Sequence, residues 1–185
     1  MRHFAAMVLL CWFFLITPIS AHADKYVPTR YGTALLVGGV YDPETFGLVL
    51  LQGQMLIDYD RVFWHEAPEA LRVKFEINGG LTTDGKHRGL LSVDMLALYY
   101  LDNFKMGQWL PYAEAGIGVI YTDFQVEGQG SRINFNPQLG IGVEYPLSSG
   151  GAMTVGLRLH HLSNANLMDE NRGVNSALLL VGYLF

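Results

Sequence analysis

The strongest constraint on the fold of this chain is an alternation of apolar and polar residues with a period of two. In residues 71–78, every odd position is apolar, and every even position carries a charge or an amide. Successive side chains of a strand point to opposite faces, so this period predicts β-strands with one apolar face. Eight such segments are separated by turn residues: 31–41, 45–57, 69–78, 88–101, 109–121, 133–145, 152–163 and 174–185.

These segments predict an all-β fold, an eight-stranded antiparallel transmembrane β-barrel of an outer membrane, spanning residues 24–185. Half of the residues are hydrophobic, yet after residue 23 no apolar run approaches the about 18 residues that indicate a membrane-spanning helix. Strands of about 9–11 residues are long enough to cross a bilayer when they close into a barrel. Aromatic residues at strand ends would form the interfacial girdles: Tyr41, Tyr59, Tyr99, Tyr100, Trp109, Tyr112, Tyr121, Tyr145, Tyr183 and Phe185. The alternative is a soluble lipocalin-type barrel with its apolar face inward, because alternation does not say which face is outside.

Residues 1–23 are predicted to be a secretory signal peptide. A short basic start precedes the apolar run from Phe4 to Ile19, and Ala21-His22-Ala23 is a small-x-small cleavage site. The alternative, a membrane anchor, fits less well because the apolar run is short and ends in that site. The single cysteine, Cys11, lies inside this segment, so the mature chain has no disulfide framework and no thiol chemistry.

Charge restricts the partners and the role of the interior. A formal net charge of −5 argues against nucleic acid as a partner. In a barrel with its apolar face toward lipid, the remaining charged positions point into an interior that has room only for side chains. They are expected to form a hydrogen-bonded structural core and no channel: Arg72, Lys74, Glu76, Asp94, Glu114, Glu144 and Arg158.

Three polar residues near the last two strands are candidates for chemistry. His161 and Ser163 are two residues apart, so a strand places them on one face, as an activated serine and its base require. Parity assigns that face to lipid, whereas His160 belongs to the interior as a satisfied core histidine. Counting back by twos from Phe185 places Asn175 on the same outer face, close to the pair. Alternatively, these polar groups simply lie at the headgroup boundary, where polarity costs little.

Residues 161–165, together with Asn171 and Gly173 ahead of the last strand, resemble the signature of PagL-type lipid A 3-O-deacylases. That stretch begins His161-Leu162-Ser163-Asn164-Ala165. The resemblance implies an outer-membrane esterase with lipid A of lipopolysaccharide as its substrate and with no metal or cofactor. It also implies Ser163 as nucleophile, His161 as general base and Asn164 as a group that helps to hold the oxyanion. With both termini periplasmic, the site would face the outer leaflet.

Two positions depart from the family pattern. The acidic member of the triad falls at Asn175, which can accept the imidazole N–H but cannot neutralise the imidazolium. Asp169 or Glu170 in the adjoining loop is the expected alternative source of charge. A glycine whose N–H serves the oxyanion is replaced by Asn166. Two other readings therefore stay open: a non-enzymatic structural or adhesive barrel of the OmpX kind, and a family member that binds lipid A without hydrolysing it.

Overall fold

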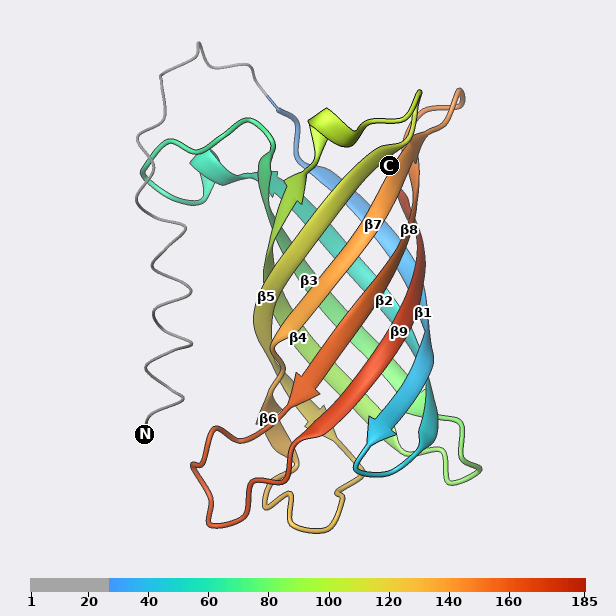
Figure 1. Ribbon diagram of the computed structural model, residues 1–185, viewed down its shortest axis with the longest axis vertical. Coiled ribbons are helices and arrows are strands. Elements are labelled where there is room, and N and C mark those ends of the chain that lie inside the picture. The colour runs from blue at the N-terminus through green and yellow to red at the C-terminus, as the bar shows by residue number, and fades with distance from the viewer. Residues whose placement is uncertain (1–26) are drawn as a thin grey trace.

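The computed structural model describes residues 27–185, and the predicted signal peptide lies outside them. Figure 1 shows a closed β-barrel in which each strand pairs antiparallel with its neighbours, and the pairings β4–β5 and β1–β9 complete the circle. The strands are β1 (Arg30–Asp42), β2 (Phe46–Asp58), β3 (Leu71–Thr82), β4 (Gly89–Tyr100), β5 (Leu110–Thr122), β6 (Ile133–Phe135), β7 (Gln138–Pro146), β8 (Ala152–Leu162) and β9 (Val174–Leu184). Two 3₁₀ turns, η1 (Tyr59–Arg61) and η2 (Asp102–Phe104), lie in connections. Among residues 27–185, no helix has the length and apolar character to cross a membrane.

Strands β6 and β7 together form the sixth of the eight predicted strands. The break between them falls at Asn136 and Pro137, and proline has no N–H to contribute to a ladder. The neighbouring pairs keep one register across the break, since Phe135 pairs with Ser163 and Gln138 pairs with His160. The Pro137 carbonyl still accepts from His161 N at 3.0 Å. The predicted eight-stranded antiparallel barrel is therefore confirmed.

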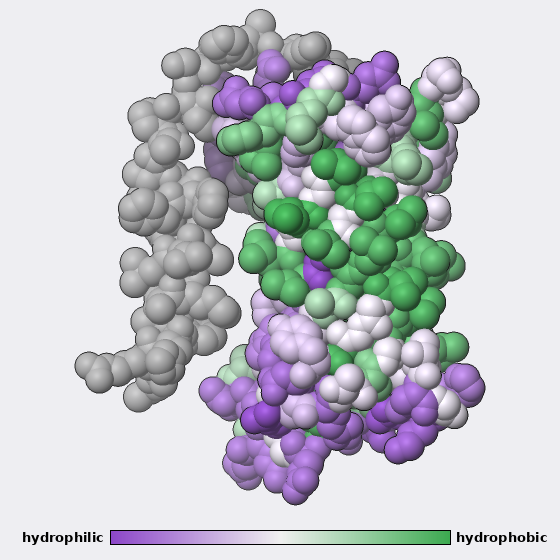
Figure 2. Space-filling view, turned by 45° about the vertical axis from the view of Figure 1, so that its right-hand side comes forward, coloured by the Kyte–Doolittle hydropathy of each residue, from purple (hydrophilic) through white to green (hydrophobic). Residues whose placement is uncertain are grey.

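The apolar face of the barrel lies outside. Leu51, Ile141 and Leu157 point outward with 67, 62 and 59% of their surface exposed. On the face shown in Figure 2, hydrophobic side chains form a band around the middle, and hydrophilic side chains gather toward both ends. Such a band between polar ends is what the hydrocarbon layer of a bilayer requires. The lipocalin-type alternative, with the apolar face inward, is wrong.

One predicted boundary was wrong at β3. The predicted segment ends at residue 78, before Gly79 and Gly80, but β3 continues through both glycines to Thr82. A Cβ at Gly80 would lie 2.4 Å from the Val49 carbonyl oxygen, so this glycine allows β2 and β3 to stay paired where their backbones approach closely. The glycine pair therefore serves strand packing and does not mark a turn.

The middle of the interior is a network of buried ion pairs. Arg158 donates to the carboxylates of Glu76 and Glu114, and Lys74 Nζ lies 2.9 Å from an oxygen of each. Asp94 accepts from four side chains: Asn78, Ser92, Asn136 and Gln138. Two cations thus balance two of the carboxylates, and hydrogen bonds satisfy the third. The expected structural core of charges is present.

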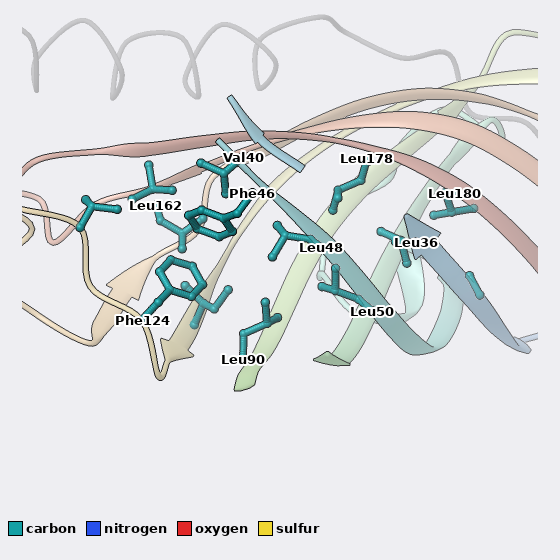
Figure 3. Packing of buried hydrophobic residues seen from close by; sticks show 14 residues of the cluster. Leu36, Val40, Phe46, Leu48, Leu50, Leu90, Phe124, Leu162, Leu178 and Leu180 are labelled. Atoms are coloured by element: carbon teal, nitrogen blue, oxygen red, sulfur yellow. The ribbon is translucent and has the colours of Figure 1, made fainter. Parts of the chain in front are cut away.

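The interior is apolar at the end of the barrel that carries the β8–β9 connection, which we call the lower end, as in Figure 1. Figure 3 shows Phe46, Leu162 and Phe124 within one hydrophobic cluster, and the Phe46 and Phe124 rings pack edge to face at 5.1 Å. Phe124 and Val126 come from the β5–β6 loop (123–132), which therefore folds back into the barrel end. The interior at this end therefore differs from the charged network at the middle of the barrel. The β5–β6 loop is therefore packed against the hydrophobic cluster through Phe124 and Val126.

Candidate active site

His161 and Asn175 form the best-defined polar contact on the outer wall of the lower end. They face each other in the β8–β9 register, and His161 Nδ1 lies 2.7 Å from Asn175 Oδ1. His161 is exposed, while its neighbours His160 and Leu162 are buried. The predicted outward orientation of His161 is confirmed, and so is its proximity to Asn175.

Gly173 leaves the space that the His161 ring occupies. A Cβ built at this glycine would lie 2.5 Å from Cε1 of His161 and 3.2 Å from Nε2. Carbon atoms do not approach that closely, so any larger residue would displace the ring. The glycine ahead of the last strand therefore helps to set the position of the histidine.

Ser163 directly follows β8, and backbone hydrogen bonds to β6 fix its position. It pairs with Phe135, and two hydrogen bonds of 2.8 and 3.1 Å join their main chains. Ser163 is half-buried between two buried neighbours, Leu162 and Asn164, which continues the outward parity of His161. Within residues 27–185, no hydrogen bond joins the serine hydroxyl to the imidazole. In free hydrolases, such catalytic hydrogen bonds are often long and tighten only with substrate.

The Asn164 side chain is buried and hydrogen-bonded to the backbone of two loop residues. Its side chain is 3% exposed, and Nδ2 donates to the backbone oxygens of Gln129 and Glu170 at 3.0 and 2.7 Å. Its backbone N–H donates to Asn171 Oδ1 at 2.7 Å. One bond of the amide thus ties the β8–β9 loop to the β5–β6 loop, and the other lies within the β8–β9 loop. The oxyanion role expected of Asn164 stays a prediction.

The following residues present backbone N–H groups in an unusual conformation. Ala165 and Asn166 have φ values of 55° and 63°, in the left-handed region. A glycine suits such a position, and asparagine is among the few other residues that tolerate it. The replacement of the family glycine by Asn166 is therefore compatible with the local backbone. Among the described residues, neither of these two N–H groups makes a hydrogen bond.

The carboxylates of Asp169 and Glu170 make no hydrogen bond to His161 or Asn175 among residues 27–185. Both are exposed, and Glu170 contacts the site only through its backbone oxygen, which accepts from Asn164. The carboxylate beside the site belongs instead to Asp42 at the end of β1. Asn175 Nδ2 donates to Asp42 Oδ2 at 2.7 Å, and Arg172 donates to Asp42 Oδ1 at 3.1 Å. The carboxylate closest to the His161–Asn175 pair in the hydrogen-bond series thus comes from the first strand, and the acidic role expected of Asp169 or Glu170 stays a prediction.

His160 lies in the interior, as predicted, but it is not fully satisfied. It is 6% exposed, and its Nε2 has no hydrogen-bond partner. Ser176, its partner across the β8–β9 ladder, also has a buried hydroxyl without a partner. The two residues line a small cavity together with the apolar residues Val40, Leu162 and Val174 of the hydrophobic cluster.

Comparisons with known proteins place the chain in a family. The model for the family described as lipid A 3-O-deacylase (PagL) matches residues 54–184. The chain belongs to the PagL family. A curated relative, lipid A deacylase PagL of Pseudomonas aeruginosa, is 29% identical over 127 residues, which cover 64% of this chain and 68% of the relative.

Solved structures show the same fold. The crystal structure of the outer membrane enzyme PagL aligns with a TM-score of 0.58 at 24% identity, covering 82% of this chain and 97% of that chain. The crystal structure of Neisserial surface protein A (NspA) aligns with a TM-score of 0.61 at 13% identity, covering 84% and 95%. At these identities the two likenesses establish the barrel alone, so the PagL family match carries the functional information.

Asp42 is a neighbour of the candidate site that the sequence analysis did not single out. It lies ahead of the region that the PagL family model matches, and 133 residues separate it from Asn175. A signal for it does exist in the predicted topology. Closing a barrel pairs the first strand with the last, so the end of the first strand must meet the start of the last strand.

Proposed function

We propose that this chain is an outer-membrane serine esterase that removes the ester-linked 3-O-acyl chain of lipid A. Membership of the PagL family supports the substrate and the bond. The observation that carries the residue assignment is the 2.7 Å contact from His161 Nδ1 to Asn175 Oδ1, on the outer wall and two residues from Ser163. A neutral histidine with Nδ1–H donated to an acceptor leaves Nε2 unprotonated, which is the form a general base needs.

In the proposed reaction, Ser163 Oγ attacks the carbonyl carbon of the acyl ester. His161 Nε2 takes the hydroxyl proton and then gives it to the departing sugar oxygen. The acyl chain is left on Ser163 as an ester, and a water molecule activated by the same nitrogen hydrolyses it. Asn175 holds the ring so that Nε2 faces the serine throughout.

The oxyanion of the tetrahedral intermediate requires hydrogen-bond donors. Because the Asn164 donors are engaged in the loop, we assign this role to the backbone N–H groups of Ala165 and Asn166, whose left-handed conformations turn them away from regular pairing. Successive N–H groups in such conformations form concave anion sites.

The orientation of the barrel would bring substrate to the site from the membrane. The C-terminus lies at the end of the barrel opposite the β8–β9 connection (Figure 1). With the termini in the periplasm, as an even number of spanning strands permits, the site faces the outer leaflet. An outward-facing histidine and serine then meet acyl chains laterally, with no passage through the filled interior.

The test is the acyl pattern of lipid A in a Gram-negative host without a 3-O-deacylase of its own. Expression of the parent chain should remove the 3-O-acyl chain, as read by mass spectrometry. Ser163→Ala should lower the rate by on the order of 10⁴- to 10⁶-fold and restore the host pattern. Ser149→Ala, in the exposed turn between β7 and β8, is the matched control and should behave as the parent.

Two outcomes of this test would favour the alternative functions, a structural or adhesive barrel and a family member that binds lipid A without hydrolysing it. Identical host patterns with the parent and Ser163→Ala, together with no binding of lipid A, would leave a structural or adhesive barrel. Identical patterns with retained binding of lipid A would leave a family member that binds without hydrolysis. Either result would refute the proposed esterase.

A further inference from the structure

Asp42, at the end of β1, makes side-chain hydrogen bonds to two residues at the start of the last strand and just before it. Its carboxylate bridges two groups from the other end of the chain, accepting from Asn175 Nδ2 at 2.7 Å and from Arg172 at 3.1 Å. Asn175 in turn contacts His161 Nδ1 at 2.7 Å. A continuous hydrogen-bonded series thus runs from Asp42 through Asn175 to His161.

A β-bulge turns Asp42 toward this series. Val40 pairs with Ser176 and Asp42 pairs with Asn175, so two residues of β1, Tyr41 and Asp42, oppose one residue of β9. In an unbroken strand, Asp42 would share the inward parity of Leu36 and Val40, which are buried. Bulges re-aim side chains in this way and are frequent beside active sites.

The carboxylate decides which way the Asn175 amide points. A carboxylate only accepts hydrogen bonds, so the amide must present its NH₂ group to Asp42 and its oxygen to His161. That oxygen accepts only from an Nδ1 that carries hydrogen, which leaves Nε2 free. Without Asp42, the amide can rotate and present NH₂ to Nδ1, and this arrangement stabilises the opposite tautomer, in which Nε2 is protonated and cannot act as a base.

We propose that Asp42 is a positioning residue for the hydrolytic site: it fixes the amide of Asn175 and, through it, the reactive tautomer of His161. It also places a negative charge one residue away from the imidazolium that forms during the reaction. The family's acidic residue is thus replaced here by an amide and a carboxylate from another strand. This inference rests on the proposed function for its effect on rate.

Repulsion between the carboxylate of Asp42 and a carboxylate introduced at position 175 allows the proposal to be tested. Asn175→Glu would restore an acid next to His161, but it would also bring that acid close to Asp42, whose Oδ2 lies 2.7 Å from the present amide nitrogen, and two neighbouring carboxylates repel each other. Asp42 should therefore help the parent and hinder the Asn175→Glu variant. Removing it should change the rate in opposite directions in the two backgrounds.

The experiment is a double-mutant cycle on purified, folded barrel in detergent micelles, with lipid A as substrate. Asp42→Ala should lower kcat by about tenfold to a hundredfold, the range for loss of a hydrogen bond to a charged group, with KM unchanged. In the Asn175→Glu background, Asp42→Ala should raise kcat. A loss of similar size in both backgrounds would overturn the proposal, because a merely structural role is indifferent to residue 175.

Two further measurements distinguish a structural role of Asp42 from its proposed role in positioning His161. Arg172→Gln removes the other partner of Asp42 without touching Asn175, so it should keep the kcat of the parent; a loss equal to that of Asp42→Ala would reduce Asp42 to a loop anchor. Ring ¹⁵N shifts of labelled histidine, assigned through His161→Gln and read at alkaline pH, report the tautomer directly. The parent should carry hydrogen on Nδ1 and Asp42→Ala should show a mixture; an unchanged tautomer would refute the inference.

The tautomer measurement also separates this inference from the proposed function. A parent chain that leaves lipid A intact but loses its Nδ1–H tautomer on Asp42→Ala would refute the esterase and retain the positioning role. A parent chain that hydrolyses lipid A with no response of rate or tautomer to Asp42→Ala would do the reverse.

Discussion

At the scale of single residues, the candidate site depends on the close packing of a histidine ring against a glycine as much as on its hydrogen bonds. The His161 ring packs against the backbone of Gly173 with no room for a Cβ. This packing and the hydrogen bond between Nδ1 and Asn175 together set the position of the ring. In the proposed mechanism, a displaced ring would carry Nε2 away from the serine, and misplacement of catalytic groups by about 1 Å costs about 10² in rate.

We therefore expect Gly173→Ala to lower kcat for deacylation by about a hundredfold while the barrel still folds. The measurement is turnover of lipid A by protein whose folding is verified by its migration on an unheated gel. Gly79→Ala is the matched control, since a Cβ there meets no atom within 4 Å. Full activity of Gly173→Ala would show that the ring has another position from which it can act.

The site also shows which residue-level features a sequence can predict. The outward positions of His161 and Asn175 follow from parity because both strands are regular. Asp42 was out of reach of parity because the bulge at Tyr41 reverses its face. The contact of the Asn164 amide with the β5–β6 loop could not be predicted, since a local motif does not reveal which distant loop packs against it.

At the scale of strands, the barrel interior combines two kinds of core. The period of two predicted the strands well, because it depends on backbone geometry alone. It could not predict that Phe124 of the β5–β6 loop folds back to pack against the apolar inward positions of the lower end. Nor could it distinguish glycines that mark turns from Gly80, where two backbones approach closely.

The buried charges link strands that are far apart in the sequence. Arg158 of β8 bonds to Glu76 of β3 and Glu114 of β5, and each partner is almost wholly excluded from solvent. We expect Arg158→Met to lower the free energy of unfolding by about 3–5 kcal/mol, because it leaves two carboxylates with Lys74 alone. Denaturant unfolding of the barrel in vesicles measures this effect.

A second substitution tests the cause of that loss. Arg158→Met combined with Glu114→Gln restores the charge balance between Lys74 and Glu76, so the double variant should be more stable than Arg158→Met alone. Additive destabilisation would show that packing, and not an uncompensated buried charge, is what Arg158 provides.

At the scale of the whole molecule, closure of the barrel is what assembles the site. The groups joined by hydrogen bonds come from β1, β8 and β9, and the β1–β9 pairing joins the two ends of the barrel chain. Neither the first nor the last strand could bring Asp42 to Asn175 by itself. The filled interior leaves the outer wall as the surface where long acyl chains can approach these groups, so the membrane band and the site belong to one surface.

The membrane position of that band is tested by placing a charge at two depths on one strand. Leu157 lies at the middle of the outward row of β8, and Met153 lies on the same row near the end opposite the site. Arginine facing lipid costs about 2–4 kcal/mol at the bilayer midplane and about 0–1 kcal/mol near its edges. We therefore expect Leu157→Arg to destabilise the barrel strongly and Met153→Arg to have little effect, as read by guanidinium unfolding in phospholipid vesicles. Since both variants add the same charge to the same face, equal effects would contradict a bilayer centred on this band.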